Sequence, residues 1–284
     1  MLMHSPDLEV YGQDHSPWVQ AVLLGLYEKD VAHALRTVPP FSVFTKWGVM
    51  MPAASVNGEP WQLESADILQ RVGFEPMSSE DTRAIYHAWQ GVLHRPDSAL
   101  RFFNGFSLAG DPGRTLARRL RNNFLRSFAT LYFYLLIRFR VLTNKPPDPD
   151  NFGDQFLYWE EKLRQTEGPF LAGEFPNTPD MMLFGIIQCH CSIPVPPVEA
   201  LQKDPRLTQV RAWISAMHVR FSEYQHLYSG VYFEPYTSPP VPANGLERAA
   251  FWVGSALMIV AFPITVPLIA FFVARVHQSP SNPI

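Results

Sequence analysis

A run of 26 residues near the C-terminus, Ala249–Ala274, contains no charged side chain. About 20 apolar residues of helix are enough to cross the hydrocarbon core of a bilayer, which is roughly 30 Å thick. Pro263 and Pro267 lie inside the run, and membrane helices tolerate proline better than soluble helices do. The run therefore predicts one transmembrane helix over 248–275. The alternative is a buried hairpin of two short helices that breaks at the prolines.

The rest of the chain has the composition of a globular protein in a reducing compartment. Its first residues, MLMHSPDLEV, lack the basic region and apolar core of a secretory signal, so we expect the body in the cytoplasm. Residues 276–284 are expected to form a short tail beyond the anchor. A net charge of −3 gives no reason to expect a nucleic-acid partner. Cys189 and Cys191 are too close in sequence to staple the fold or to form a tetrahedral zinc site, so we expect no metal.

The first 75 residues combine strand and helix signals. Ser16-Pro17 is a standard helix start, with serine at the N-cap and proline at the first helical position. Asn57-Gly58 is a favoured hairpin turn. The predicted elements are a strand over 8–11, a helix from Ser16 to Tyr27, strands over 53–56 and 61–63, and a helix from Glu64. This pattern predicts a small α/β domain over 7–75.

The following part of the chain has only helical periodicity. One predicted helix begins at Ser78. Four more are predicted over 113–142, 154–164, 178–191 and 207–227. In the last of these, five apolar residues recur at helical spacing and are expected to face the core: Val210, Trp213, Ile214, Met217 and Phe221. We therefore expect an all-α domain over 77–233, followed by a proline-rich, semi-rigid linker over 234–247.

Four local patterns resemble those of the cytosolic glutathione transferases. The first two are Ser16-Pro17-Trp18 at a helix start after the first strand, and Met51-Pro52 before a hairpin, where the family has a cis proline. The third is the segment from Leu63 to Leu69, which is close to the family's Glu-Ser-x-x-Ile motif. The fourth is the loop from Pro169 to Gly173 before Thr178-Pro179-Asp180, which is similar to the family's helix-capping box, although aspartate follows threonine by two residues rather than three. The resemblance covers about residues 7 to 235.

The resemblance implies a thioredoxin-like α/β domain, then an all-α domain, with the predicted transmembrane helix added. It also implies glutathione as the co-substrate. A thiol with a pKa near 8.5 reacts as the thiolate, and a hydroxyl at a helix N-terminus stabilises that anion. Ser16 has this chemistry and position; the alternative is that it only caps the helix. Tyr11, at the end of the first strand, is a rival donor, since other classes of the family keep a catalytic tyrosine there.

The remaining candidate residues would hold the tripeptide. A cis bond before Pro52 would turn the N–H and C=O of Met51 outward, where they can pair with a peptide-like ligand. By resemblance, Ser65 would bind the γ-glutamyl carboxylate and Glu64 its ammonium group, at a helix start suited to anions. The alternative for this pair is a plain helix cap with a solvated acid. Lys46 either reaches the glycine carboxylate or is a solvated surface lysine.

Seven arginines between Arg114 and Arg140 alternate with apolar residues. Such a helix either contacts an anionic bilayer surface beside the anchor or packs in the bundle with a solvated charged face.

The function implied by these patterns is transfer of glutathione to a lipophilic small-molecule electrophile by a membrane-anchored protein, in contact with membrane lipid. The resemblance also implies a homodimer. A non-catalytic membrane-tethered adapter with the same fold is the alternative. Glutathione-dependent isomerisation is a third possibility, whereas serine rather than cysteine at position 16 argues against a disulfide reductase.

Overall fold

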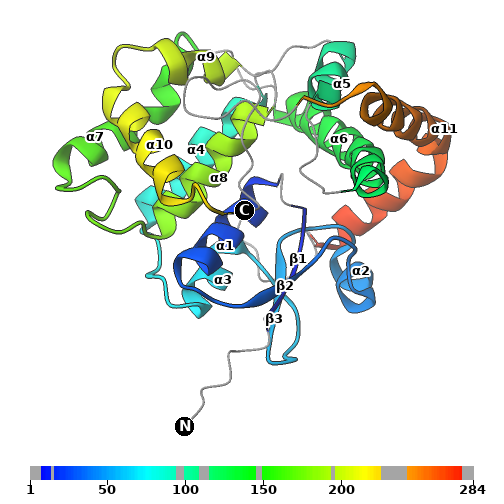
Figure 1. Ribbon diagram of the computed structural model, residues 1–284, viewed down its shortest axis with the longest axis horizontal. Helices are drawn as coiled ribbons and strands as arrows, with labels where there is room; N and C mark the ends of the chain where they lie inside the picture. Colours follow the sequence, from blue (N-terminus) through cyan, green and yellow to red (C-terminus); the bar gives the residue numbers. More distant parts are fainter. Residues whose placement is uncertain are drawn as a thin grey trace.

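The computed structural model describes residues 8–13, 16–93, 99–108, 115–144, 149–192, 196–224 and 242–276 (Figure 1). Its strands are β1 (Leu8–Tyr11), β2 (His33–Arg36), β3 (Ala53–Val56) and β4 (Gln62–Leu63). Its α-helices are α1 (Pro17–Glu28), α2 (Phe41–Trp47), α3 (Ser65–Arg71), α4 (Ser79–Gln90), α5 (Ala99–Leu108), α6 (Leu116–Asn144), α7 (Leu157–Gln165), α8 (Thr178–Ser192), α9 (Pro196–Lys203), α10 (Thr208–Arg220) and α11 (Gly245–Val276), with 3-10 turns η1 (Gly91–Leu93) and η2 (Phe152–Phe156).

The four strands form one sheet in the order β2-β1-β3-β4. β1 and β2 are parallel, whereas β3 is antiparallel to both of its neighbours. The sequence analysis missed β2 and α2, because His33–Arg36 and Phe41–Trp47 are too short to show a clear period. Proline at the N-cap and Gly48 at a φ of 66° delimit α2.

The helical half is organised around α8, which is buried and packs on α1 and α4. Asp180 and Asn177 cap α8: the Asp180 N–H donates to Asn177 Oδ1 at 3.2 Å, and the Asn177 N–H donates to Asp180 Oδ2 at 2.9 Å. This is a reciprocal capping box with the regular spacing of three. The expectation of an imperfect box starting at Thr178 was therefore wrong; the Thr178 hydroxyl instead donates to the Glu75 carbonyl of the α/β half, at 2.5 Å.

α10 is shorter than predicted. It ends at Arg220, where the sequence analysis expected a helix to Leu227. The five apolar residues that were expected to face inward are all buried, as predicted. Residues 225–241, which include positions 234–241 of the expected linker, and the residues after Val276 lie outside the described part of the chain. α5 and α9 were not expected from the sequence.

The apolar C-terminal run forms one continuous helix, α11, with Pro263 and Pro267 inside it. The predicted alternative of two short helices is therefore wrong. By its length and composition, with a mean hydropathy of 2.0, the part of the helix over Gly245–Leu268 is long and apolar enough to cross a membrane. α11 also packs on α6, α5 and α2, and Figure 1 shows it beside α6 with α2 near its distal end.

The predicted fold class is confirmed by the strand order and the order of elements. A small mixed sheet with α1 and α3 packed together is followed by a helical domain, as in a thioredoxin-like domain joined to an all-α domain. One apolar helix follows them. The core is continuous across the two halves, because α1 residues such as Leu23 belong to the same buried cluster as Leu183 of α8.

His190 in α8 gives this core a dependence on pH. The ring is fully buried, and Nε2 lies 2.9 Å from the Ala88 carbonyl oxygen. Burial lowers the pKa of His190 from 6.5 to about 4. Because the unfolded chain then binds a proton that the folded chain does not, this residue makes stability fall as pH falls from 6.5 towards 4.

We expect the burial of His190 to lower the unfolding free energy by on the order of 2 kcal/mol when the pH falls from 7 to 5. Urea denaturation of His190→Gln should show a correspondingly smaller loss over this range. His87→Gln, which changes an exposed histidine of α4, is the matched control and should behave like the parent chain. An equal pH dependence in His190→Gln and the parent would contradict the prediction.

Candidate functional site

The register of the sheet brings three separate segments to one of its ends. Tyr11 pairs with Ala53, and Ala53 pairs with Leu63. The residues that follow β1, precede β3 and follow β4 must therefore lie near one another. A direct contact agrees with this, since the backbone N–H of Gln13 lies 3.3 Å from the sulfur of Met51.

Ser16 occupies the N-cap position of α1, with Pro17 at the first helical position. Its backbone is fully used, because the N–H donates to the Gln13 carbonyl at 3.0 Å and the carbonyl accepts from Gln20 at 2.8 Å. Its side chain, however, makes no capping hydrogen bond to the helix. The half-buried hydroxyl is therefore not committed to the cap that the sequence analysis offered as the alternative role.

Tyr11 lies in a different environment. Its ring is 2% exposed and packs with Val43 and Ala53 in a small cluster beneath α2. The hydroxyl lies 3.4 Å from the Val49 carbonyl oxygen, to which it donates. Burial, with a smaller effect of Tyr132 on α6, raises the pKa of Tyr11 well above its usual value. The phenol therefore stays protonated and already has an acceptor within the chain.

Met51 and Pro52 lie immediately before β3, and the peptide bond between them is cis, as the resemblance implied. Within the described residues, neither the N–H nor the C=O of Met51 has a main-chain hydrogen-bonding partner. The side chain packs between the main core and the cluster around Tyr11. The backbone of Met51 can therefore pair with an extended ligand.

Glu64 follows β4 with φ 75° and ψ 108°, a conformation that residues other than glycine rarely adopt. Such strain costs on the order of 1–3 kcal/mol and occurs preferentially at functional sites. Ser65, the next residue, begins α3 and is buried. The carboxylate of Glu64 is exposed, at the same end of the sheet as Ser16 and Met51.

Tyr86 of α4 closes this region from the helical half and was missed by the sequence analysis. It is 52% exposed, and its ring centroid lies 5.9 Å from that of Trp18. Desolvation and the negative charge of Glu64 raise the pKa of Tyr86. Trp89 also packs against Trp18, with ring centroids 5.6 Å apart and the rings tilted by 58°. The only sequence signal was an aromatic residue next to the core positions of a helix, which does not distinguish a site residue from a packing residue.

Lys46 is exposed on α2, and its Nζ lies 4.2 Å from the centroid of the Trp47 ring. Trp47 packs on the cluster that contains Tyr11. This places Lys46 on the α2 side of the candidate site, but a role in binding stays a prediction.

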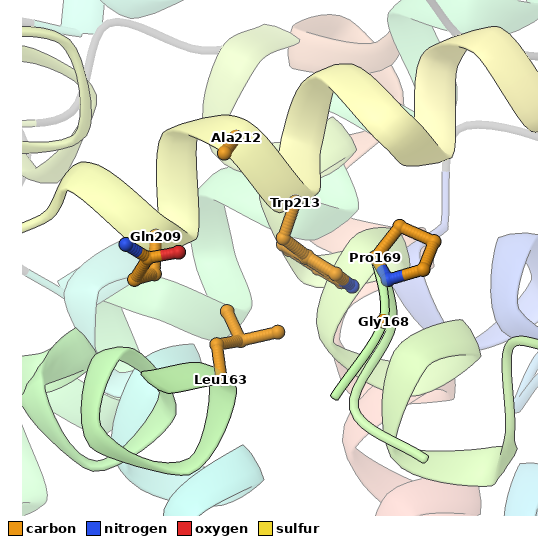
Figure 2. A pocket seen from close by; sticks show the side chains of 6 residues that line it. All are labelled: Leu163, Gly168, Pro169, Gln209, Ala212 and Trp213. Carbon is orange, nitrogen blue, oxygen red and sulfur yellow. The ribbon is translucent and has the colours of Figure 1, made fainter. Parts of the chain in front are cut away.

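A small hollow lies elsewhere, in the helical half. Figure 2 shows it between α7, the following loop and α10, lined by Leu163, Gly168, Pro169, Gln209, Ala212 and Trp213. Its volume of about 120 Å³ is below the range of roughly 300–1,000 Å³ typical of ligand pockets, and none of the predicted site residues lines it. Among the described residues, no group of three His, Cys, Asp or Glu side chains could hold a metal ion.

No protein-family model matches the chain, and no curated protein matches it. Several solved structures are similar to it. A theta class glutathione S-transferase from Xanthomonas axonopodis pv. citri, with glutathione bound, is 18% identical, with a TM-score of 0.42 over 82% of this chain and 100% of that one. A maleylacetoacetate isomerase from Anaeromyxobacter dehalogenans is 15% identical, with a TM-score of 0.41 over 86% and 100% of the two chains. A dehydroascorbate reductase from Chlamydomonas reinhardtii is 14% identical, with a TM-score of 0.47 over 89% and 99%.

Proposed function

We propose that the chain binds glutathione at this end of the sheet and transfers it to a lipophilic electrophile. The observation that carries the proposal is the shared location of the Met51 backbone, which has no main-chain partner among the described residues, and the Ser16 hydroxyl, which does not cap α1. In this arrangement the Met51 N–H and C=O pair with the cysteinyl residue of glutathione, as a short antiparallel strand would. Ser65 and Glu64 then bind the γ-glutamyl carboxylate and ammonium groups, and Lys46 the glycine carboxylate.

Ser16 has the role of a hydrogen-bond donor to the sulfur. A donor aimed at the thiolate lowers the pKa of the bound thiol. The thiol proton leaves to solvent, and the Ser16 hydroxyl keeps its own proton. The sulfur then attacks the electrophilic carbon, a C–S bond forms, and the leaving group departs with the electron pair of the broken bond. Tyr11 is the weaker candidate for this role because its hydroxyl donates to Val49 and its ring is buried.

We further propose that α11 attaches the protein to a membrane, with the globular body on the cytoplasmic side. Its length and composition support this. Apolar electrophiles partition into bilayers, so a membrane-bound transferase would meet a lipophilic second substrate there. A homodimer, which the resemblance implies, also remains a prediction.

Thermal unfolding of the full-length protein in detergent micelles, titrated with glutathione, tests the binding step. The full chain is needed because α11 packs on α6 and α2. A ligand that binds only the folded state stabilises it by about 2.7 kcal/mol at 100 times its Kd. This corresponds to a rise in Tm of roughly 4–5 °C for a chain of this size.

Ser65→Ala should raise the Kd about tenfold or more, since a hydrogen bond to a charged group contributes roughly 1.5–3 kcal/mol. Ser79→Ala, at an exposed position that begins α4, is the matched control and should keep the parent Kd. If millimolar glutathione leaves the Tm of the parent chain unchanged, the transferase proposal fails and the membrane-tethered adapter replaces it.

A further inference from the structure

The start of α11 is attached to α6 by specific polar contacts. Asn244 and Glu247 form a reciprocal capping box, with N–H to oxygen distances of 2.8 and 2.9 Å. The Glu247 carboxylate, which is 2% exposed, also forms an ion pair with Arg119 of α6 at 3.1 Å. The preceding residue, Ala243, donates its N–H to the Leu108 carbonyl at the end of α5. The apolar helix therefore begins in a fixed position on the body.

The two helices then run side by side in the same direction. The contact between Glu247 and Arg119 is followed, seven residues further along α11, by a close approach of Gly254 to Ser127. A Cβ atom added to Gly254 would lie 2.2 Å from Ser127 Oγ and 2.8 Å from the Phe124 carbonyl oxygen. Phe251, Ser255 and Met258 are buried on the same side, and the distal part of the helix reaches α2.

The opposite side of α11 is apolar and exposed. Seven of its exposed residues follow one another at intervals of three, four or seven, which places them on one stripe of the helix: Leu246, Val253, Leu257, Val260, Ile264, Leu268 and Phe271. Ile259 and Phe262, which are 62% and 36% exposed, lie off this stripe in the distal half of the helix. Val260 and Ile264 are 79% and 76% exposed. At 1.5 Å per residue the stripe is about 38 Å long. We call these seven residues the outer stripe.

We infer that α11 lies within one leaflet of a bilayer, parallel to its surface, with the outer stripe toward the acyl chains and the inner side still packed on α6 as far as Met258. A docked α11 that spanned the bilayer would carry the neighbouring part of α6 into the hydrocarbon. That part contains Arg121, two residues beyond Arg119, and Arg126, one residue before Ser127, and arginine in the hydrocarbon core is costly. An interfacial position keeps both the contacts with α6 and the hydration of these arginines.

The occupant that fits the outer stripe is lipid rather than a second copy of the chain. No charged residue occurs in 249–274, so the helix lacks the polar rim that surrounds most protein interfaces. A helix that is apolar on all sides is typical of a buried or lipid-covered position. Beside the start of α11, Arg118 and Arg121 of α6 are exposed and can contact anionic headgroups.

This arrangement brings the candidate site close to the bilayer surface. α11 contacts α2, the helix that covers Tyr11 and carries Lys46, and Phe41 at the start of α2 is 82% exposed. The inference rests on the membrane attachment in the proposed function and specifies its geometry. A lipophilic substrate would then reach the site from the leaflet in which α11 lies.

Labelling of the C-terminal tail distinguishes a helix in the leaflet from a helix across it. Full-length Ser281→Cys protein is bound to preformed phosphatidylcholine vesicles, with or without phosphatidylserine, and treated with a membrane-impermeant maleimide before and after detergent. The parent chain measures the labelling of Cys189 and Cys191. We expect position 281 to be labelled to the same extent before and after detergent. Labelling only after detergent would show a translocated tail and overturn the inference.

Vesicle flotation tests whether the outer stripe contacts lipid. Val260→Asp should reduce flotation at least tenfold, whereas Val219→Asp, at a valine of α10 with a similar exposure of 76%, should leave it unchanged. Equal flotation of both variants and the parent would overturn the inference. So would a parent chain that does not float but forms a dimer disrupted by Val260→Asp, because a second copy would then cover the stripe. A parent chain that shows the expected labelling and flotation but does not bind glutathione would contradict the transferase proposal and leave the membrane inference standing.

Discussion

Ser16→Ala is expected to lower kcat/KM for glutathione conjugation by about 100-fold or more, with little change in stability. A single preorganised donor to a developing or bound anion typically contributes 10²–10³ in rate. Loss of a capping serine usually costs about 1 kcal/mol, but the Ser16 side chain makes no capping hydrogen bond. The unfolding free energy should therefore change by less than about 0.5 kcal/mol. Steady-state kinetics with a model electrophile and urea denaturation measure the two effects.

A pH profile separates an effect on the thiol from a structural effect. In Ser16→Ala the apparent pKa of bound glutathione should rise by about one unit or more, because the charged form loses its donor. Tyr11→Phe is the matched control: it removes a buried hydroxyl that donates to Val49, and should leave that pKa unchanged. The reverse pattern, a raised thiol pKa in Tyr11→Phe alone, would assign the role of donor to Tyr11.

Asp180→Ala is expected to destabilise the fold by about 3–5 kcal/mol, the usual result of removing one partner from a buried charged network. The carboxylate accepts hydrogen bonds from the Leu171 and Asn177 N–H groups at 3.0 and 2.9 Å, and from Trp213 Nε1 at 2.7 Å. All three donors would lose this buried partner. Urea denaturation measures the change.

Two variants show whether the loss comes from this network. Asp67→Ala, at an exposed aspartate in the first turn of α3, should change stability by less than about 1 kcal/mol. Asp180→Asn keeps an acceptor oxygen, so its free energy of unfolding should fall by less than that of Asp180→Ala. A loss for Asp180→Ala no larger than that for Asp67→Ala would contradict the prediction.

Elements with strong local signals were predicted well. β1 was located residue for residue, and α1 begins where Ser16-Pro17 indicated. The hairpin at Asn57-Gly58 joins β3 and β4, with Asn57 and Gly58 both at positive φ. Each depends on residues within a few positions of one another, so the chain itself carries the information. β2 and α9 were missed because four and eight residues give almost no period.

The candidate site was predictable in its location rather than in its interactions. Ser16, Met51 and Glu64 were recognisable from motif order, and the sheet register brings their segments to one end. The positive φ of Glu64 and the proximity of Tyr86 had no sequence signal. The proximity of Tyr86 depends on how the α/β half meets α4, which is a contact between distant segments.

The amino-acid order alone accounts for the start of α1, the hairpin turn, most helices of the helical half and the long apolar run, because these follow from short-range sterics, hydrogen bonding and periodic burial. Only the folded chain decides that the Ser16 hydroxyl does not cap α1, while the Tyr11 hydroxyl donates to the Val49 carbonyl. It also decides that α11 is docked on α6 through Glu247 and Gly254. The physical reason is that apolar burial has no direction of its own, so 26 uncharged residues suit lipid and protein alike until polar contacts and a close helix crossing place one side against a partner.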